Sequence, residues 1–588
     1  MSVAAIPGGI PDAATGRERA MYVALDAYLA DLFRWHPTAA TASGYHRHDA
    51  ALDDWSPAAV RERAAVAHRH RKAIEPFMGD RLSPGARVDL RLVLDDIEGT
   101  LFGLNDLRPY ERDPQFHVDL LGNALLYLTL LEPEAPEWPA RLEALAGRLE
   151  AVPDFLAHAR QTLGEPPRVV AEMVLKTNAG NLKFVEEGLT PLFDRAPAQK
   201  ARLARAQAVA ATALRGFQEF IETTLLPRAH GDWRLGRDLW SRKLRMTLQS
   251  SMGPDAIVAR AHAAIAEIRA RMLAIAEPLH HRLGSDHTHG GSGDERLNAL
   301  VGCVVNAVSA RHPTRGTLFA YVGEAVERIK AHIRARDLVT LPPDDDNFVL
   351  EPTPGFLDGM AVAFFNPPPT LEPHMKKSFW ISSLPRGGTP EADRALEESF
   401  LREYNDYALQ GLAIHEAFPG HYVQYWHALK SPLATVYKKV FSSGTFAEGW
   451  AVLAENLMYS NGYAADEPEN LLIHLKHALR APMNALLDAR LHASGDDEPE
   501  LDRWALDLMQ RIGFQEEAEA RGKLRRAKVT STQLSTYFVG LVEMNDLVDA
   551  ARRAEGPAFR LRAFTDRLLA CGTIPPRDAR ALLGLGEA

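Results

Sequence analysis

Hydrophobic side chains recur at helical spacing along most of this chain. Between residues 88 and 107 they fall close to a repeat of about 3.6 residues, the period of an α-helix. The same spacing predicts further helices at residues 140–152, 196–222, 255–275 and 318–336. Prolines and glycines separate these segments. The pattern therefore predicts a mostly α-helical protein built from many helices.

One segment departs from this pattern. Short runs of β-branched and aromatic residues lie between prolines and glycines at residues 348–350, 361–365 and 378–382, and such runs predict strands. We therefore expect one small β-sheet directly before the histidine-containing motif at residues 415–421. The edge of this sheet could pair with the main chain of an extended peptide, or the sheet could merely cover the helices. The pattern leaves both open.

The composition is that of a large globular protein. Of the 588 residues, 46% are hydrophobic and 24% are charged. The 67 basic and 77 acidic residues give a net charge of −10, and no long basic run occurs, so we expect no nucleic-acid partner. No uninterrupted apolar run of about 18 residues is present, so we expect neither a membrane span nor a membrane partner.

Two further features bear on location. The two cysteines, Cys303 and Cys571, are too few for a disulfide framework, which fits a reducing compartment. Residues 1–9 have neither the basic start nor the apolar run of a signal peptide. These features predict a cytoplasmic protein. The oligomeric state stays open.

The sequence H-E-A-F-P-G-H at residues 415–421 carries the strongest chemical signal. Neutral imidazoles are good zinc ligands, and a glutamate beside one can take a proton from an attacking water. In a straight helix His421 would lie roughly 9 Å along the axis from His415 and on another face. Pro419 cannot continue the helical hydrogen bonds, and Gly420 adds backbone freedom. We therefore expect the helix to end or bulge here, turning His421 back toward His415; two unrelated histidines at a helix end are the alternative.

A pair of glutamates lies in the helical segment F-A-E-G-W-A-V-L-A-E, residues 446–455. Glu448 and Glu455 are seven positions apart, so they share one face of a helix but lie roughly 10 Å apart along its axis. Only one of them can easily bind the same metal as the two histidines. The other could accept a hydrogen bond from the second nitrogen of a ligating histidine. Two solvated glutamates are the alternative.

The chain contains two motifs, H-E-A-F-P-G-H-x-x-Q and E-G-W-A-x-x-x-E. Together they resemble the motifs of a large bacterial family that is still classed as a domain of unknown function. Its members are regarded as zinc metallopeptidases. More distantly, F-A-E-G-W-A is similar to the N-E-G-F-A segment of gluzincin aminopeptidases, whose glutamate binds zinc. The resemblance implies a Zn²⁺ cofactor with the ligands His415, His421 and Glu448. It assigns Glu416 as the general base, and it places Glu455 and Gln424 behind the ligands as supports.

The resemblance covers most of the chain. The segments A-T-A-S-G-Y-H at 40–46 and D-W-S-P at 54–57 are similar to the family's opening, and C-G-T-I-P-P at 571–576 is similar to its closing segment. A C-terminal element of the family, R-Y-x-x-x-P-G-Q-A-x-x-Y-x-x-G, is matched only in part at residues 526–540. The arginine, glutamine, second tyrosine and final glycine are present, whereas the first tyrosine, the Pro-Gly pair and the alanine are not.

Two residues of that element receive roles from the resemblance. A phenol such as that of Tyr537 can donate a hydrogen bond to the oxyanion of a tetrahedral intermediate, and Arg526 can clamp a substrate carboxylate. Without the resemblance, Tyr537 would be a buried core tyrosine and Arg526 a surface charge. The missing positions of the element suggest that the pocket wall and the substrate differ from the family pattern.

We expect a single metallopeptidase-like domain over residues 1–588, with two lobes around a cleft. The polar, glycine-rich segment 284–295 is the best linker in the sequence. It would be a flexible loop between an N-terminal helical lobe, residues 1–283, and a catalytic lobe, residues 296–588.

Four histidines lie in or beside this loop, namely His280, His281, His287 and His289. A second metal site is one interpretation of them. Glycine-rich polar loops are flexible, however, and no carboxylate or histidine at helical spacing completes a rigid cage. The sequence therefore favours a solvated loop.

These residues favour hydrolysis of an amide bond, first of all a peptide bond, by a zinc metallopeptidase-like enzyme. One alternative is a specialised amidase that cleaves a small non-peptide or modified-peptide amide in a biosynthetic or detoxification pathway. Another is a catalytically silent helical scaffold. Glu416 argues against the scaffold, because a structural zinc needs no base beside it. Substrate identity and the choice between exo- and endo-cleavage stay open.

Overall fold

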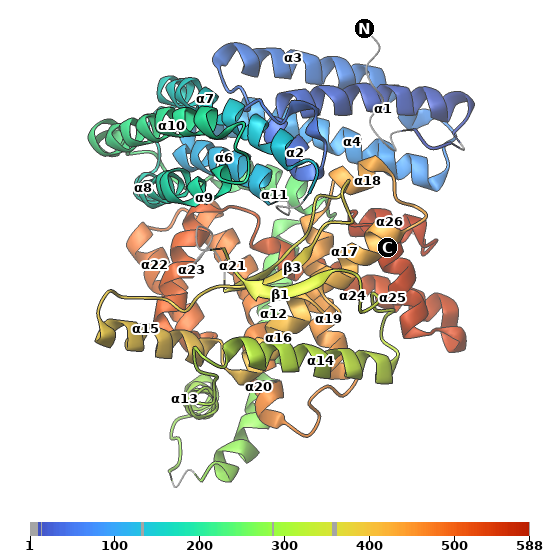
Figure 1. Ribbon diagram of the computed structural model, residues 1–588. Coiled ribbons are helices and arrows are strands. Elements are labelled where there is room, and N and C mark those ends of the chain that lie inside the picture. The colour runs from blue at the N-terminus through green and yellow to red at the C-terminus, as the bar shows by residue number, and fades with distance from the viewer. Residues whose placement is uncertain (1–9, 13, 131–134, 285–286, 355–361, 587–588) are drawn as a thin grey trace. The chain divides into compact units, whose positions relative to one another are not determined.

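The structure is a computed structural model, and it describes residues 10–586 apart from 13, 131–134, 285–286 and 355–361. The described residues are mostly helical, and one small sheet accompanies the helices, as the hydrophobic pattern predicts (Figure 1). None of the described helices is both long enough and apolar enough to cross a membrane.

The chain divides into two compact units. The first contains residues 1–233, 368–375 and 435–441, and the second contains the remainder. The linker expected at 284–295 therefore falls inside the second unit rather than between two lobes. The reason is packing, because the helices on either side of this segment contact each other and the first of them also packs against two later helices.

The first unit holds eleven α-helices among its described residues. They are α1 (Gly16–Trp35), α2 (Pro37–Ser43), α3 (Pro57–Ile74), α4 (Pro84–Phe102), α5 (Pro109–Arg112), α6 (Pro114–Leu126), α7 (Trp138–Thr162), α8 (Arg168–Lys183), α9 (Thr190–Phe193), α10 (Lys200–Phe220) and α18 (Val436–Val440). The expected helices at 140–152 and 196–222 correspond to α7 and α10.

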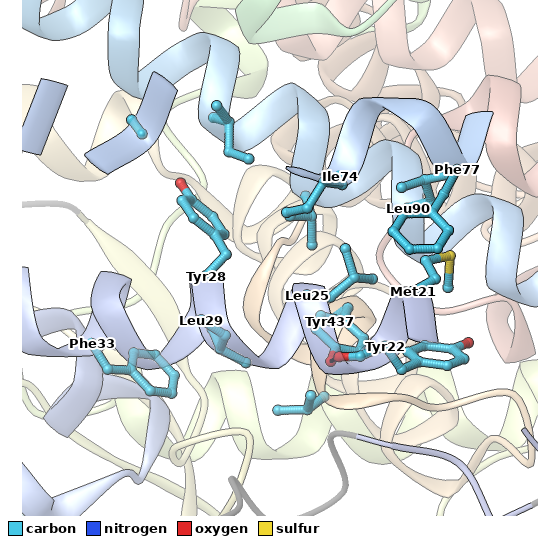
Figure 2. Packing of buried hydrophobic residues seen from close by; sticks show 14 of the residues in the cluster. Met21, Tyr22, Leu25, Tyr28, Leu29, Phe33, Ile74, Phe77, Leu90 and Tyr437 are labelled. Atoms are coloured by element: carbon cyan, nitrogen blue, oxygen red, sulfur yellow. Dashed lines mark hydrogen bonds between the residues drawn. The ribbon is translucent and has the colours of Figure 1, made fainter. Parts of the chain in front are cut away.

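The apolar core of the first unit forms where α1, α3 and α4 pack together (Figure 2). Met21 and Leu25 lie one turn apart on α1 and are fully buried, as is Leu90 on α4. Although α18 is distant in sequence, it also contributes, because Tyr437 stacks on Tyr22 with the ring centroids 5.7 Å apart. Long-range apolar packing thus draws residues 435–441 into this unit.

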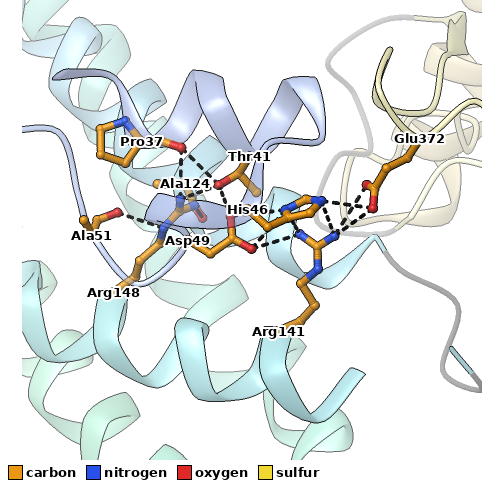
Figure 3. A network of polar contacts seen from close by, with 9 residues as sticks. All are labelled: Pro37, Thr41, His46, Asp49, Ala51, Ala124, Arg141, Arg148 and Glu372. Carbon is orange, nitrogen blue, oxygen red and sulfur yellow. Dashed lines mark hydrogen bonds and ion pairs between the residues drawn. The ribbon is translucent and has the colours of Figure 1, made fainter. Parts of the chain in front are cut away.

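A polar network in the first unit involves the segment that resembles the family's opening (Figure 3). His46 lies 3.1 Å from the carboxylate of Asp49 and 3.0 Å from that of Glu372. Arg141 on α7 pairs with the same two carboxylates, at 3.0 and 3.2 Å. The opening motif therefore fastens residues 368–375 to α7, which is a structural role.

The second unit contains fifteen described α-helices. They are α11 (Arg237–Leu248), α12 (Pro254–Arg282), α13 (Gly293–Val308), α14 (Leu318–Arg336), α15 (Pro390–Glu403), α16 (Asp406–Glu416), α17 (His421–Lys430), α19 (Gly444–Ser460), α20 (Pro468–Ala478), α21 (Arg480–Ala493), α22 (Glu498–Asp507), α23 (Glu517–Val529), α24 (Ser535–Glu555), α25 (Leu561–Ala570) and α26 (Pro576–Leu582). The expected helices at 255–275 and 318–336 correspond to α12 and α14.

The predicted sheet is present in the second unit. Its strands are β1 (Phe348–Pro352), β2 (Ala363–Asn366) and β3 (Lys377–Ile381), in the order β1-β3-β2. The central strand β3 is parallel to β1 and antiparallel to β2, with Phe365 opposite Phe379. Strand β2 is thus an edge strand. Residue 361, where we expected the second strand to begin, lies outside the described residues.

Candidate metal centre

Helix α16 ends where the Pro-Gly pair follows it. The helix stops at Glu416, the Phe418–Pro419 peptide bond is cis, and α17 begins at His421. Gly420 donates its N–H to the carbonyl of Ile414 at 3.0 Å, so the chain turns back tightly on the end of α16. A Cβ atom on Gly420 would lie only 1.8 Å from the carbonyl oxygen of His415, so this position admits no side chain.

This turn brings the two histidines of the motif together. The ring centroids of His415 and His421 are 4.8 Å apart, with the ring planes at 89°. From α19, Glu448 places its Oε2 atom 3.5 Å from Nε2 of His415 and 3.7 Å from Nε2 of His421. Ligand atoms around a tetrahedral zinc are separated by roughly 3.3–3.8 Å, given bonds of about 2.0–2.3 Å. The spacing fits that geometry.

Burial and charge also fit a cation here. Among the described residues, Oε2 of Glu448 is a buried acceptor without a hydrogen-bond partner. Burial opposes ionisation of Glu448, but the neighbouring His415 and His421 outweigh it and hold the pKa of the carboxyl well below its ordinary value. Burial likewise lowers the pKa of His415, yet Glu448 and Glu455 raise it well above the usual value. The interior of the cluster therefore attracts positive charge.

Glu455 lies behind the cluster on the same helix as Glu448. Its Oε1 atom is 2.8 Å from Nδ1 of His415. A hydrogen bond there keeps a proton on Nδ1, so Nε2, which faces Glu448, is the nitrogen that a metal would bind. The geometry thus separates the two glutamates in the way that the resemblance implies.

A buried histidine that the sequence analysis did not single out lies beside Glu455. His474 on α20 lies 3.8 Å from the other oxygen of Glu455 and stacks on Tyr459, with ring centroids 3.9 Å apart. Burial lowers the pKa of His474 to about 4. Its position in the apolar run L-L-I-H-L, residues 471–475, is the signal that could have marked it as a core residue.

Glu416 faces the same site from the end of α16. The residue is buried, with 9% of its surface exposed, and it lines the cavity described below. Its Oε2 atom accepts a hydrogen bond from the backbone N–H of Phe365 on β2 at 2.9 Å. The edge strand therefore orients the candidate base, a contact that the sequence could not reveal.

Three hydrogen bonds hold the ligand-bearing elements together. The indole N–H of Trp450, two residues beyond Glu448, donates to the carbonyl of Pro419 at 2.9 Å. Gln424 donates to the hydroxyl of Thr573 at 2.7 Å, and the carbonyl of Thr573 accepts the N–H of Ser443 at 2.8 Å. The closing segment of the chain thus joins α17 to the start of α19. Gln424 acts through Thr573, since that is the hydrogen bond that its side chain makes.

A cavity of about 1190 Å³ opens over the cluster, and all of its lining residues belong to the second unit. The three candidate ligands and Glu416 line it, together with β2 residues and the side chains of Lys523, Arg526 and Tyr537. The candidate centre is therefore accessible to a molecule larger than water.

The half-matched C-terminal element forms a connected wall of this cavity. Arg526 donates to Oε1 of Gln533 at 3.0 Å, and the amide nitrogen of Gln533 lies 3.3 Å from the hydroxyl of Tyr537. Burial raises the pKa of Tyr537, and the nearby Glu448 carboxylate raises it further. The phenol therefore keeps its proton and can donate a hydrogen bond.

Comparison with known proteins places the chain in a family. The family described as bacterial protein of unknown function (DUF885) matches residues 37–583. The chain belongs to this family. No curated protein matches it.

Two solved structures share the fold of this DUF885 protein. A protein of unknown function from Shewanella oneidensis, described as a candidate lipoprotein, is 25% identical, with a TM-score of 0.79 over 97% of this chain and 100% of that one. A second candidate lipoprotein, from Colwellia psychrerythraea, is 15% identical, with a TM-score of 0.76 over the same shares. Neither description names a reaction.

These relatives overturn one prediction. Lipoproteins are held at a membrane, so our prediction of a cytoplasmic location is wrong. The cysteine count was weak support for it, because a chain of 588 residues can bury a large core and needs no disulfides in any compartment. Residues 1–9, on which the prediction also rested, lie outside the described residues.

Proposed function

We propose that this DUF885 protein is a zinc-dependent hydrolase that cleaves amide bonds in peptides. The observation that carries the proposal is the convergence of His415, His421 and Glu448 beside a second carboxylate, that of Glu416, in one large cavity. Three protein ligands leave one position of a tetrahedral zinc open, which is the arrangement of catalytic rather than structural sites.

Each residue then has a chemical role. A zinc ion held here would polarise the scissile carbonyl and lower the pKa of the attacking water. Glu416, oriented by the N–H of Phe365, accepts the proton of that water and later delivers it to the leaving amine. Tyr537, protonated and facing the same cavity, donates a hydrogen bond to the oxyanion.

The cavity favours a peptide over a small amide. At about 1190 Å³ it exceeds the roughly 300–1,000 Å³ of pockets that enclose a drug-sized molecule. The edge strand β2 lines it, and an extended peptide can add its main chain to such an edge. Both features support a peptide as the substrate class.

Positive charge on α23 favours a peptide with a free C-terminus. Lys523 and Arg526 lie three residues apart on this helix and both line the cavity. Glu519 lines it too, but its carboxylate lies 3.8 Å from Arg480 and is partly neutralised. Burial lowers the pKa of Lys523 to about 7, so Lys523 is only partly charged at neutral pH. Arg526 is therefore the main cation for a substrate carboxylate, which favours cleavage near a peptide C-terminus.

The test measures zinc and turnover in the same samples. A panel of short peptides identifies a substrate, and His415→Ala and Glu448→Ala are expected to lose both zinc and activity. Glu416→Gln keeps the size of the side chain, so zinc should stay bound while the rate falls by ~10²–10⁴-fold. Full activity of Glu416→Gln, or unchanged zinc in both ligand variants, would reject the proposal.

A second comparison tests the preference for a free C-terminus. Each peptide is offered as the free acid and as the C-terminal amide. The acid should be preferred by the wild type, and Arg526→Gln should raise KM for the acid while leaving the amide almost unchanged. Equal turnover of both forms would contradict the preference for a free C-terminus. It would not bear on the role of Glu416 as general base.

A further inference from the structure

A second cluster of metal-binding side chains lies between α12 and α13, within the second unit. His280 is near the end of α12, His287 and His289 lie in the connecting loop, and Cys303 is on α13. The ligand atoms of these four residues all lie within 4.8 Å of one another. We propose that they form a structural zinc site, separate from the cluster at His415 and independent of the proposed hydrolysis.

The distances within this cluster match a tetrahedral site. The Nε2 atoms of His280 and His289 are 3.2 Å apart, and Sγ of Cys303 is 3.5 Å from Nε2 of His287. Roughly 3.3–3.8 Å is expected between ligands at zinc bond lengths of about 2.0–2.3 Å. Two of the six pairs of donor atoms therefore have about the spacing of zinc ligands, and the other pairs lie within 4.8 Å.

The orientation of the rings supports convergence on that point. The ring of His280 is inclined at 85° to that of His287 and at 66° to that of His289, with centroids 5.0 Å apart in both pairs. The rings of His287 and His289 are inclined at 82°. Rings packed for apolar contact alone have no reason to turn their nitrogens inward. Here the nitrogens approach one another, and His280 is 4% exposed.

The chemistry of the donors selects the metal. Three imidazoles and one thiol, without a carboxylate, exclude the hard cations Mg²⁺ and Ca²⁺ and suit zinc. Four protein ligands also fill the tetrahedral shell, so no position remains for a reacting water. The cluster therefore has the composition of a structural site, in contrast to the open cluster of His415, His421 and Glu448.

A metal here would stabilise the loop that joins α12 to α13. Gly284 and Gly291 have φ angles of +72° and +88°, conformations that favour glycine, and the residues around them are mostly polar. Bound zinc would fasten the loop to both helices, and its binding energy would add to the stability of the fold. Helix α12 also packs against α20 and α21, which contribute residues to the cavity wall.

Cobalt distinguishes the two clusters, because only this one contains sulfur. In the full chain loaded with Co²⁺, a cobalt–thiolate bond gives charge-transfer absorption in the near ultraviolet that nitrogen and oxygen ligands do not give. The wild type should show this band. Cys303→Ser should lose it, whereas Cys571→Ser, the matched change at the other cysteine, should keep it.

Zinc content supplies the second measurement. After dialysis the wild type should hold about two zinc ions per chain, one in each cluster. Cys303→Ser with His289→Ala should hold one and keep its activity, and His415→Ala should also hold one and keep the cobalt band. The Tm of the double variant should be lower than that of the wild type, because the loop is no longer joined to both helices by zinc. Adding zinc should not restore it.

Three results would overturn the inference. They are a wild type without the cobalt–thiolate band, a band that survives Cys303→Ser, and a His415→Ala protein that holds no zinc at all. A protein without hydrolytic activity would contradict the proposed function only. The cobalt–thiolate band and its dependence on Cys303 would still be observed.

Discussion

Gly449 and Gly540 pack backbone against backbone where α19 meets α24. A Cβ atom on Gly449 would lie 2.5 Å from the carbonyl carbon of Gly540, and one on Gly540 would lie 2.2 Å from the carbonyl oxygen of Thr445. Neither position has room for a side chain. Because Glu448 precedes Gly449 and Tyr537 lies one turn before Gly540, this close approach brings a candidate ligand and a candidate oxyanion donor to the same cavity.

We expect Gly540→Ala to force the two helices apart. The added methyl group overpacks a closed contact, which typically costs 1–3 kcal/mol, and it should also weaken zinc retention by displacing Glu448. Gly444→Ala is the control, because Gly444 lies on α19, the other helix of this contact, and its added Cβ would meet nothing within 4 Å. Urea unfolding and zinc titration of both variants test this. Equal behaviour of the two would refute the role of the contact.

Trp450→Phe tests the contact that holds the turn between the two histidines. Phenylalanine preserves most of the buried ring but cannot donate to Pro419, whose carbonyl would lose its partner. Stability should fall by about 1–3 kcal/mol, the cost of an unsatisfied buried acceptor. Zinc affinity should fall with it, measured by competition with a chelator. A variant that unfolds earlier but binds zinc as tightly as the wild type would limit Trp450 to packing.

Glu455→Gln tests the support behind His415. The amide no longer carries the charge that favours a proton on Nδ1 of His415, so zinc affinity should fall by ~10–100-fold. Glu416→Gln removes the same charge from a residue whose side chain accepts a hydrogen bond from the backbone N–H of Phe365, and it should retain zinc. Competition with a chelator measures the zinc affinity of both variants. If both lost zinc equally, net charge rather than the hydrogen bond of Glu455 would be responsible.

The pH dependence of stability should report on Glu543 in α24. Burial, and then the charge of Asp546, raise the pKa of Glu543 from 4.5 to about 7, while Arg577 and Arg580 oppose the shift. Its side chain accepts a hydrogen bond from Ser250. The folded-state pKa of Glu543 lies above its unfolded value. The protonated side chain therefore contributes fully to the free energy of unfolding below pH 4.5, and this contribution is lost as pH rises to about 7.

Glu543→Gln should remove that loss. The variant stays neutral, so its free energy of unfolding at pH 8 should exceed that of the wild type by about 3 kcal/mol, the energy of a shift of this size. Near pH 4.5 the two should be similar. Asp546→Asn, an exposed change on the same helix, is the control and should leave most of the pH dependence in place. Urea unfolding between pH 4.5 and 8 measures both. Parallel curves for Glu543→Gln and the wild type would contradict the assignment.

Local sequence was sufficient for the elements and for the turn in the histidine motif. Helical and strand spacing are properties of neighbouring residues, so α7, α10, α12, α14 and the three strands could be predicted from their own segments. The end of α16 before Pro419 and Gly420 follows from proline's missing N–H and from a position that tolerates no Cβ.

Contacts between distant segments could not be predicted in this way. Residues 435–441 join the first unit because Tyr437 packs on Tyr22, and no local signal marks that return. For the same reason the expected division at 284–295 differs from the observed one. Composition predicted a flexible polar loop, but only packing shows that the helices around it belong to one unit.

The two candidate metal sites show the same limit at the level of single residues. Sequence spacing allowed either Glu448 or Glu455 to face the histidines, and the choice depends on how α19 lies against α16. The sequence favoured a solvated loop around His287 and His289 because it offered no further ligand at helical spacing. Cys303 reaches them from the next helix. Neighbouring residues determine the helices, the strands and the points where they end. Which distant side chains come together depends on long-range packing, which only the tertiary structure decides.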